Sequence, residues 1–318
     1  MSQAANSIRI GTRGSELARW QAEHVAQMLR AVYPGIQVLI QVIRTRGDAV
    51  LDKPLPQIGG KGVFTAEIEA ALRACQIDLA VHSLKDLPTD PPDGLAIGAI
   101  PARETVADVL VSRFNVGLAD LPNGQTIGTS SRRRAAQILA ARPDLRIVDL
   151  RGNIPTRLEK ALQLEGPYGG AVMAYAGLAR LRRLDAVAQV LPLDLILPAP
   201  GQGALAVQCR DDAPSRELLA PLNDAPTRLA VSAERAFLAG LGGGCALPIA
   251  AAGELAEGRL SLRGRVLSPD GSRRIDVAST IDLPEQDVDQ LAACMGLGYQ
   301  LAGDALRQGA ALLLDETA

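Results

Sequence analysis

Short apolar runs alternate with segments of helical periodicity along the first two thirds of the chain, and this alternation restricts the fold more than any other feature. Strand-like runs, rich in β-branched side chains, occupy residues 7–11, 36–45 and 77–83. Amphipathic helices are indicated at residues 16–35 and 64–76, where apolar side chains recur every three or four positions. Strands separated by helices in this order predict α/β layers around a largely parallel sheet.

The same alternation begins again further along the chain. Strand and helix signals follow one another at residues 125–131, 132–143, 145–152 and 170–177. This second series predicts a second lobe similar to the first, with a cleft between the two. The segment 191–203 is rich in Pro and Gly, as a crossover between lobes would be.

The last third of the chain has a different pattern. It contains a helical segment at 225–241 and a hairpin-like pair of strands at 259–280, and it closes with an Ala- and Leu-rich helix. This order predicts a small α+β unit. The fold class is therefore α/β, with two lobes of mixed, mainly parallel sheets plus a small C-terminal α+β domain. The expected domains are residues 1–101 with a return segment at 200–220, residues 102–199, and residues 221–318.

The charge balance and the apolar runs restrict the partners of the chain. The formal net charge is −2 and aromatic residues make up 3% of the 318 residues, whereas nucleic-acid binders need basic surfaces or aromatic stacking platforms. No run of about 18 uncharged apolar residues occurs, and no basic segment followed by an apolar stretch opens the sequence. We expect a soluble cytoplasmic protein with no nucleic-acid and no membrane partner.

Arginines recur at the predicted strand-to-helix turns. Arg13 follows the first strand, Arg133 and Arg134 begin a helix directly after Ser130 and Ser131, and a further pair, Arg151 and Arg157, flanks the start of the next helix. The carboxyl edges of α/β sheets bind ligands, and guanidinium groups pair with carboxylates and phosphates through two hydrogen bonds. A small polyanionic substrate explains this clustering. For the helix after Ser131, a serine cap with solvated arginines is an equal alternative.

A second group of polar side chains follows the buried strand at 77–83. His82, Lys85 and Asp86 lie at or just beyond its end, before Pro88. Asp86 could stabilise a cation or transfer a proton, with Lys85 keeping it ionised. It could equally be a turn residue in an Asp- and Pro-rich loop, and His82 taken alone is more typical of a structural hydrogen-bond partner.

Cys245 stands apart from the other three cysteines, because it follows a run of glycines at 242–244. Glycines leave room for another group to approach the main chain, so a thiol with a covalent partner is one interpretation, although a reactive thiol also needs exposure. We expect Cys75, Cys209 and Cys294 to fill core positions. The spacing of the cysteines and of the two histidines predicts no metal site.

Taken together, these stretches resemble the porphobilinogen deaminase family over nearly the whole chain. The most specific motifs are AVHSLKDLP at 80–88, LRGNIPTRL at 150–158 and GGGCALPI at 242–249. The resemblance implies a transferase of tetrapyrrole biosynthesis. Such an enzyme condenses four porphobilinogen molecules, with loss of ammonia, onto a covalently bound dipyrromethane primer and then releases hydroxymethylbilane by hydrolysis. It also implies a monomer with two lobes like those of periplasmic binding proteins.

The resemblance assigns roles to individual residues. Cys245 would carry the dipyrromethane cofactor through a thioether, and Asp86 would be the catalytic carboxylate that also contacts the cofactor. The other cofactor contacts would be Lys85, Ser130, Ser131, Arg133 and Arg134. The substrate contacts would be Arg13, Ser15, Arg151, Arg157, Arg180 and Gln202. Residues 47–62 would form a loop over the active site, in which Lys61 and the adjacent Phe64 fit the family pattern.

Two alternatives to this enzyme stay open on the residues alone. A non-catalytic two-lobed protein that binds a small polycarboxylate would share the fold, because one fold carries many functions. A thiol-dependent transferase acting on another polyanion would share the arginines and Cys245. Turnover of porphobilinogen distinguishes these possibilities.

Overall fold

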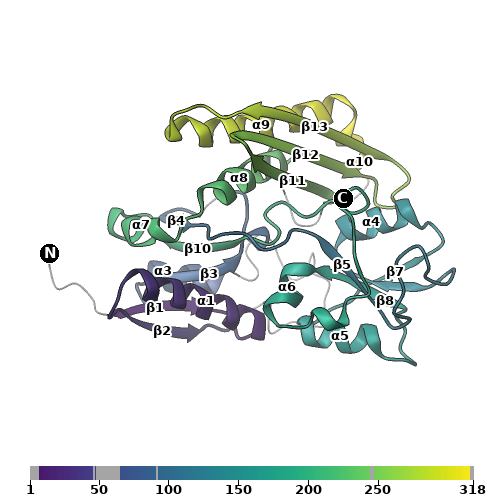
Figure 1. Cartoon of the computed structure of the whole chain (residues 1–318), viewed down its shortest axis with the longest axis horizontal. Coiled ribbons are helices and arrows are strands. Elements are labelled where there is room, and N and C mark those ends of the chain that lie inside the picture. The colour runs from purple at the N-terminus through teal and green to yellow at the C-terminus, as the bar shows by residue number, and fades with distance from the viewer. Residues whose placement is uncertain (1–6, 46, 48–64, 91, 244–246, 316–318) are drawn as a thin grey trace. The chain divides into compact units, whose positions relative to one another are not determined.

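The computed structural model describes residues 7–45, 47, 65–90, 92–243 and 247–315 (Figure 1). Within these ranges the strands form two five-stranded sheets and one three-stranded sheet. The chain divides into two compact units, residues 1–103 with 204–228, and residues 104–203 with 229–318. This grouping does not decide the three domain boundaries expected from the sequence, which stay a prediction.

The sheet of the first unit has four strands that run in one direction and one that is reversed. Its order is β2 (Gln37–Val42), β1 (Ser7–Thr12), β3 (Leu79–Ser83), β10 (Leu205–Arg210) and β4 (Leu95–Ala99). β1 pairs in parallel with β2 and β3, whereas β10 pairs antiparallel with both β3 and β4. The reversed strand β10 is the segment that returns to this unit late in the sequence.

Helices connect the strands of this first sheet and pack against it. They are α1 (Glu16–Val32), α3 (Ala66–Arg73), α7 (Ala213–Leu219) and the short 3₁₀ helices η2 (Leu84–Asp86) and η4 (Ala220–Leu222). α1 turns its apolar face toward the sheet, where Val25 and Leu29 share a core with Ile10 and Val207. The helix-period spacing of those side chains is what buries them together.

The sheet of the second unit repeats the arrangement of the first. Its order is β7 (Arg146–Val148), β6 (Thr126–Gly128), β8 (Gly170–Ala174), β5 (Asp108–Ser112) and β9 (Gln189–Val190). β6 pairs in parallel with β7 and β8, and β5 pairs antiparallel with β8 and β9. The reversed strand again takes the fourth place, so the expected mixed, mainly parallel α/β class is confirmed.

Two helices of the second unit that follow parallel strands start with a side-chain cap. α4 (Arg132–Ala141) is capped by Ser131, and α5 (Ile154–Leu162) by Asn153, whose Oδ1 accepts a hydrogen bond from Thr156 N at 3.0 Å. Such caps satisfy backbone N–H groups that a helix start leaves unpaired. α6 (Tyr175–Arg180) and the 3₁₀ helix η3 (Leu184–Ala186) complete this part of the chain.

The C-terminal part of the second unit is an antiparallel sheet with helices. β11 (Ile249–Ala256), β12 (Arg259–Leu267) and β13 (Arg274–Asp282) pair in sequence order, and the hairpin expected within 259–280 is confirmed. The helices are α8 (Ala225–Gly240), α9 (Asp287–Arg307) and α10 (Ala310–Asp315). Their apolar side chains meet around the fully buried ring of Phe237, so the α+β character predicted for this segment is also confirmed.

Two of the three cysteines expected in the core are there. Cys209 in β10 and Cys294 in α9 are fully buried. The expectation for Cys75 is wrong, because its side chain is exposed. α3 ends at Arg73 and the chain reverses at once, with Cys75 at a positive φ of 55°. The helix is thus shorter than its apolar pattern indicated, and Cys75 lies in the turn that follows.

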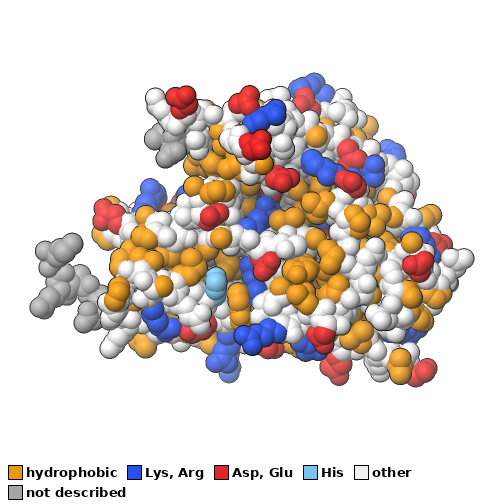
Figure 2. All heavy atoms as spheres, viewed as in Figure 1, with side chains coloured by type: hydrophobic (Ala, Val, Ile, Leu, Met, Phe, Trp, Pro, Cys, Tyr) orange, Lys and Arg blue, Asp and Glu red, His pale blue; other side chains and the backbone are white. Residues whose placement is uncertain are grey.

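Charged side chains of both signs are interspersed on the face drawn in Figure 2, with apolar side chains between them. No helix among the described residues is both long and apolar enough to cross a membrane.

The packing around Phe237 gives a test of this C-terminal core. A Cβ atom at Gly264 would lie 2.7 and 2.8 Å from Cε2 and Cε1 of Phe237. We therefore expect Gly264→Ala to lower the free energy of unfolding by about 1–3 kcal/mol, because a rigid, buried ring has no room to shift. Urea denaturation measures this change.

The control is Gly296→Ala in α9, where nothing lies within 4 Å of the added Cβ atom. This change is expected to stabilise the helix by about 0.5–1 kcal/mol. Equal stability of wild type and Gly264→Ala would contradict the close packing described here.

Candidate functional site

The turn between β1 and α1 carries two of the predicted site residues. Ser15 caps α1, with its Oγ accepting a hydrogen bond from Ala18 N at 3.3 Å. The buried Thr12 closes the same turn from the other side, because its Oγ1 donates to Ala18 O at 2.9 Å. These bonds fix the turn, and Arg13 lies within it with a half-buried side chain.

The turn after β3 places Lys85 and Asp86 at the end of a buried strand. Leu84 is fully buried, and its N–H donates to Ala204 O at 3.0 Å, which anchors η2 to the residue that precedes β10. Leu87 N then donates to Leu84 O at 3.1 Å and closes the turn. Asp86 projects from it as an exposed side chain, while Lys85 is half-buried. The carboxylate is therefore accessible to a ligand while its backbone is held.

His82 lies in the same strand but faces the interior. It is 7% exposed, and its Nε2 lies 3.1 Å from Gln208 Oε1 on the neighbouring β10. Burial lowers the pKa of His82 from its ordinary 6.5 to about 4; the hydrogen bond to Gln208 opposes this shift, and the charge on Arg13 adds to it. His82 is therefore a neutral, structural hydrogen-bond partner near pH 7, as the simpler interpretation of the sequence held.

In the second unit, side-chain hydrogen bonds fix the turn between β6 and α4. Thr129 Oγ1 accepts a hydrogen bond from Ser131 N at 3.2 Å, and Ser130 Oγ donates to Leu150 O at 3.2 Å. Ser131 Oγ accepts from Arg134 N at 3.4 Å, which makes it the cap of α4. The serine cap is thus confirmed.

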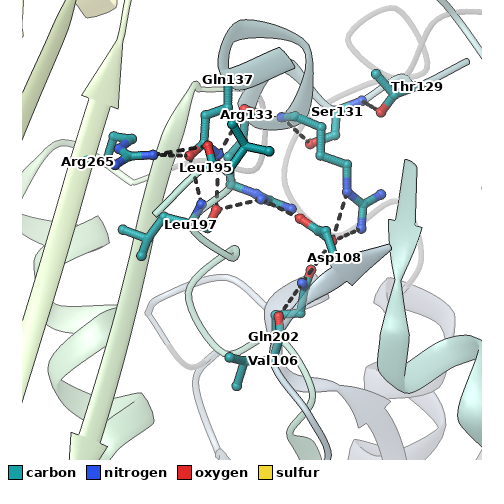
Figure 3. Close-up of polar contacts among 11 residues, drawn as sticks. Val106, Asp108, Thr129, Ser131, Arg133, Gln137, Leu195, Leu197, Gln202 and Arg265 are labelled. Carbon is teal, nitrogen blue, oxygen red and sulfur yellow. Dashed lines mark hydrogen bonds and ion pairs between the residues drawn. The ribbon is translucent and has the colours of Figure 1, made fainter. Parts of the chain in front are cut away.

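The arginines that follow this cap are not solvated as the simpler alternative supposed. Arg132 is exposed, but Arg133 is 4% exposed and Arg134 is 6% exposed. A buried guanidinium group requires a partner, and both arginines find the same one in Asp108, the first residue of the reversed strand β5 (Figure 3).

Asp108 is fully buried and accepts hydrogen bonds on both carboxylate oxygens. Its Oδ2 accepts from Arg133 Nη1 at 2.7 Å, and its Oδ1 accepts from Arg134 Nε at 3.1 Å and Nη2 at 2.7 Å. Burial alone would raise the pKa of this carboxyl group. The attraction of the two arginines and their hydrogen bonds outweigh burial, so the pKa lies far below its usual range.

Gln202 joins the same cluster from the Pro- and Gly-rich segment that precedes β10. Its side chain is fully buried, and its Nε2 donates to Asp108 Oδ1 at 2.9 Å and to Val106 O at 2.7 Å. The structure therefore brings four of the predicted residues together, since Ser131, Arg133, Arg134 and Gln202 all belong to this network (Figure 3). Sequence analysis missed Asp108; the one signal is an acid at the start of an apolar run.

The remaining predicted residues of the second unit lie at other helix ends. Arg151 is half-buried in the turn before α5, and Arg157 in its first turn donates from Nε to Gly152 O at 2.8 Å. Arg180 ends α6, and its Nη2 donates to Gly203 O at 2.6 Å. Burial lowers the pKa of Arg180 to about 10, against the opposing effect of Glu104.

Three of the predicted residues, Cys245, Lys61 and Phe64, lie outside the described residues, as does the loop at 48–62. In the part of the chain that the structure describes, no three His, Cys, Asp or Glu side chains gather as metal ligands.

Comparisons with known proteins agree along most of the sequence. The family described as "Porphobilinogen deaminase, dipyromethane cofactor binding domain" matches residues 8–217, and "Porphobilinogen deaminase, C-terminal domain" matches residues 228–306. A porphobilinogen deaminase of Syntrophomonas wolfei is 46% identical over 98% of this chain and 99% of its own length. One of Syntrophotalea carbinolica is 47% identical over 98% and 96%.

Among solved structures, the periplasmic aliphatic sulphonate binding protein of Escherichia coli is 17% identical, with a TM-score of 0.37. The alignment covers 96% of this chain and 79% of that protein.

The burial of His82 predicts a pH dependence of stability. Between pH 6.5 and about 4 the unfolded chain binds a proton on this side chain that the folded chain does not, so the free energy of unfolding falls as the pH falls. The loss amounts to at most about 1.4 kcal/mol per pH unit, or ~3 kcal/mol across the interval. His82→Gln should remove this contribution, which denaturant titrations at several pH values measure.

The matched control is His24→Gln, because His24 is half-buried and stacks on Trp20 at a ring distance of 5.0 Å. A change in slope that His82→Gln shows and His24→Gln does not is assigned to His82. Parallel curves for wild type and His82→Gln would show that His82 is protonated in the folded protein as readily as in the unfolded chain.

Proposed function

The chain belongs to the porphobilinogen deaminase family, and we therefore propose that it condenses four porphobilinogen molecules head to tail, with loss of ammonia, and releases hydroxymethylbilane by hydrolysis. The observation that carries this proposal is the extent of the match: the two family domains together span residues 8–217 and 228–306. Relatives named for the activity are aligned over 98% of the chain. We also infer a monomer that works in the cytoplasm on a small dissolved substrate.

We assign the attachment of a dipyrromethane cofactor to Cys245, through a thioether. When bound, this cofactor supplies the pyrrole carbon to which the first substrate unit is joined. The chemistry of the available donors fits such a polycarboxylate. The guanidinium nitrogens Arg133 Nη2 and Arg134 Nη1 make no hydrogen bond to any described residue. Their N–H groups are therefore donors for a carboxylate. Lys85, Ser130 and Ser131 would add further contacts.

Asp86 is assigned the catalytic role. Loss of ammonia from porphobilinogen leaves a cation that is delocalised onto the ring nitrogen, and an ionised carboxylate stabilises such a charge. The proton that the attacking pyrrole carbon releases also needs an acceptor, and an Asp86 carboxylate oxygen can take it. The exposure of Asp86 at the end of β3, on a turn anchored by the buried Leu84, supports this assignment.

The substrate's acetate and propionate groups require basic partners. We assign them to Arg13, Arg151, Arg157 and Arg180, with Ser15 and Gln202 as neutral contacts. Arg13 and Ser15 share the β1–α1 turn, and Arg151 and Arg157 flank the cap of α5, so each pair is held by a fixed turn. Lys61 would act from the loop at 47–62, and Phe64 from the residues just after it.

The covalent cofactor gives the first test. We expect the intact mass of the purified protein to exceed the translated mass by one dipyrromethane, and Cys245→Ser to abolish this increment, because no sulfur is left to form the thioether. Electrospray mass spectrometry of the whole chain measures it.

The matched control is Cys75→Ser, since the Cys75 thiol is exposed; this variant should keep the increment. Active wild-type protein of unmodified mass would refute the covalent cofactor, as would a Cys245→Ser variant that keeps the full increment.

The role of Asp86 gives the second test. Asp86→Asn keeps the shape of the side chain but removes its charge and its capacity to accept a proton, so we expect kcat to fall by about 100-fold or more. Attachment of the cofactor should still be detectable by mass. Asp90→Asn, a nearby exposed aspartate, serves as the control with near-normal turnover. Near-normal turnover of Asp86→Asn would remove this residue from the mechanism.

A further inference from the structure

The carboxylate of Asp108 is fully buried and accepts hydrogen bonds on both oxygens. It has about four acceptor positions, and four N–H groups point at it: Arg133 Nη1 on Oδ2, and Arg134 Nε, Arg134 Nη2 and Gln202 Nε2 on Oδ1 (Figure 3). Because Asp108 has no exposed surface and both of its oxygens accept hydrogen bonds from neighbouring side chains, it does not bind a ligand or transfer a proton itself. Any effect of Asp108 on the reaction is therefore exerted through the side chains that it binds.

The cluster around Asp108 carries an uncompensated positive charge. Two guanidinium groups face one carboxylate, and among the described residues the charges that act on Arg133 are those of Asp108 and Arg134. A buried ion cluster contributes little to stability compared with apolar side chains of the same volume. An excess of one positive charge at nearly buried arginines therefore suits the capture of a single negative group.

The two arginines are also fixed in direction. They are neighbours in the first turn of α4, where their charges repel each other and would drive the side chains apart. Asp108 draws both to one point, and Arg133 Nη1 is held a second time by Leu197 O at 2.7 Å. Gln137 locks Leu197 in turn, accepting from its N–H at 2.8 Å and donating to its carbonyl oxygen at 3.0 Å.

This frame extends to the three-stranded sheet. Arg265 of β12 is 4% exposed and donates from Nη1 to Gln137 Oε1 at 2.9 Å (Figure 3). Its Nε pairs with Asp276 Oδ1 at 2.6 Å. The guanidinium group of Arg133 is thus held by a continuous polar network, and that of Arg134 is held by two hydrogen bonds to Asp108. Their unused N–H groups keep one orientation, which is what recognition of a planar carboxylate requires.

We propose that Asp108 is a positioning residue that holds Arg133 and Arg134 together as one singly charged receptor for a single carboxylate group of the bound cofactor. This inference rests on the proposed function. For a positioning residue, removal of Asp108 changes anion binding in the opposite direction to that expected for a purely electrostatic role. If Asp108 only reduced the positive charge, its removal would strengthen anion binding, whereas loss of positioning weakens it.

The experiment measures cofactor loading at full length. Cofactor-free wild type, Asp108→Asn and Asp144→Asn are incubated with increasing porphobilinogen, and the loaded fraction is followed by intact mass. Asp108→Asn should raise the half-saturating porphobilinogen concentration by about tenfold, the size of one lost charge-assisted hydrogen bond. Asp144→Asn is the matched control, because Asp144 also pairs with an arginine of this unit, Arg142 at 2.7 Å, but on the surface; it should load as wild type does.

Thermal unfolding of each variant is measured beside loading, and all assays are run below the lowest transition. A merely structural role would reduce the amount of folded protein and leave the half-saturating concentration of the folded fraction unchanged. Should Asp108→Asn fail to fold, Asp108→Glu keeps the charge and displaces it by one methylene group. That variant is expected to show a smaller increase in the half-saturating concentration.

Loading of the folded Asp108 variant at the wild-type concentration, or at a lower one, would overturn the positioning role. Failure of the proposed function looks different, because then the wild type itself acquires no mass increment from porphobilinogen.

Discussion

The second unit depends on one buried carboxylate shared by two guanidinium groups. Asp108 connects the start of β5 to the start of α4, and the amide of Gln202 joins the Pro- and Gly-rich segment before β10 to the same carboxylate. Removing any single member would leave a buried charge or polar group without its partner, which is far more unfavourable than losing a surface ion pair. The arrangement of the polar side chains at this edge of the sheet follows from that constraint.

The two five-stranded sheets explain why polar side chains gather where they do. In the first sheet, β1 and β3 end in turns that carry Arg13 and Asp86. In the second sheet, β6 ends in the turn that carries Ser131. Because caps and buried anchors fix the turns, side chains that the sequence places there are held at defined positions.

Much of this could be predicted from residue patterns, because the informative signals are local. The strand and helix alternation, the Ser131 cap and the hairpin between β12 and β13 each depend on neighbours in the sequence. The burial of Arg133 could not be predicted, since its partner lies 25 residues away and pairs with it only once the sheet has formed. Cys75 was misplaced for a related reason: an apolar period does not say where a helix ends.

The register of β5 has a consequence for how the sheet assembles. Asp108 pairs with Ala174 of β8, and Val109 follows it with Met173. A slip of one residue would place Ala107 or Val109 opposite the two guanidinium groups and turn the carboxylate to the other face. Both arginines would then be enclosed without a counter-ion, so misaligned strands are penalised heavily. The ion cluster thereby favours the native register of β5 over a register shifted by one residue.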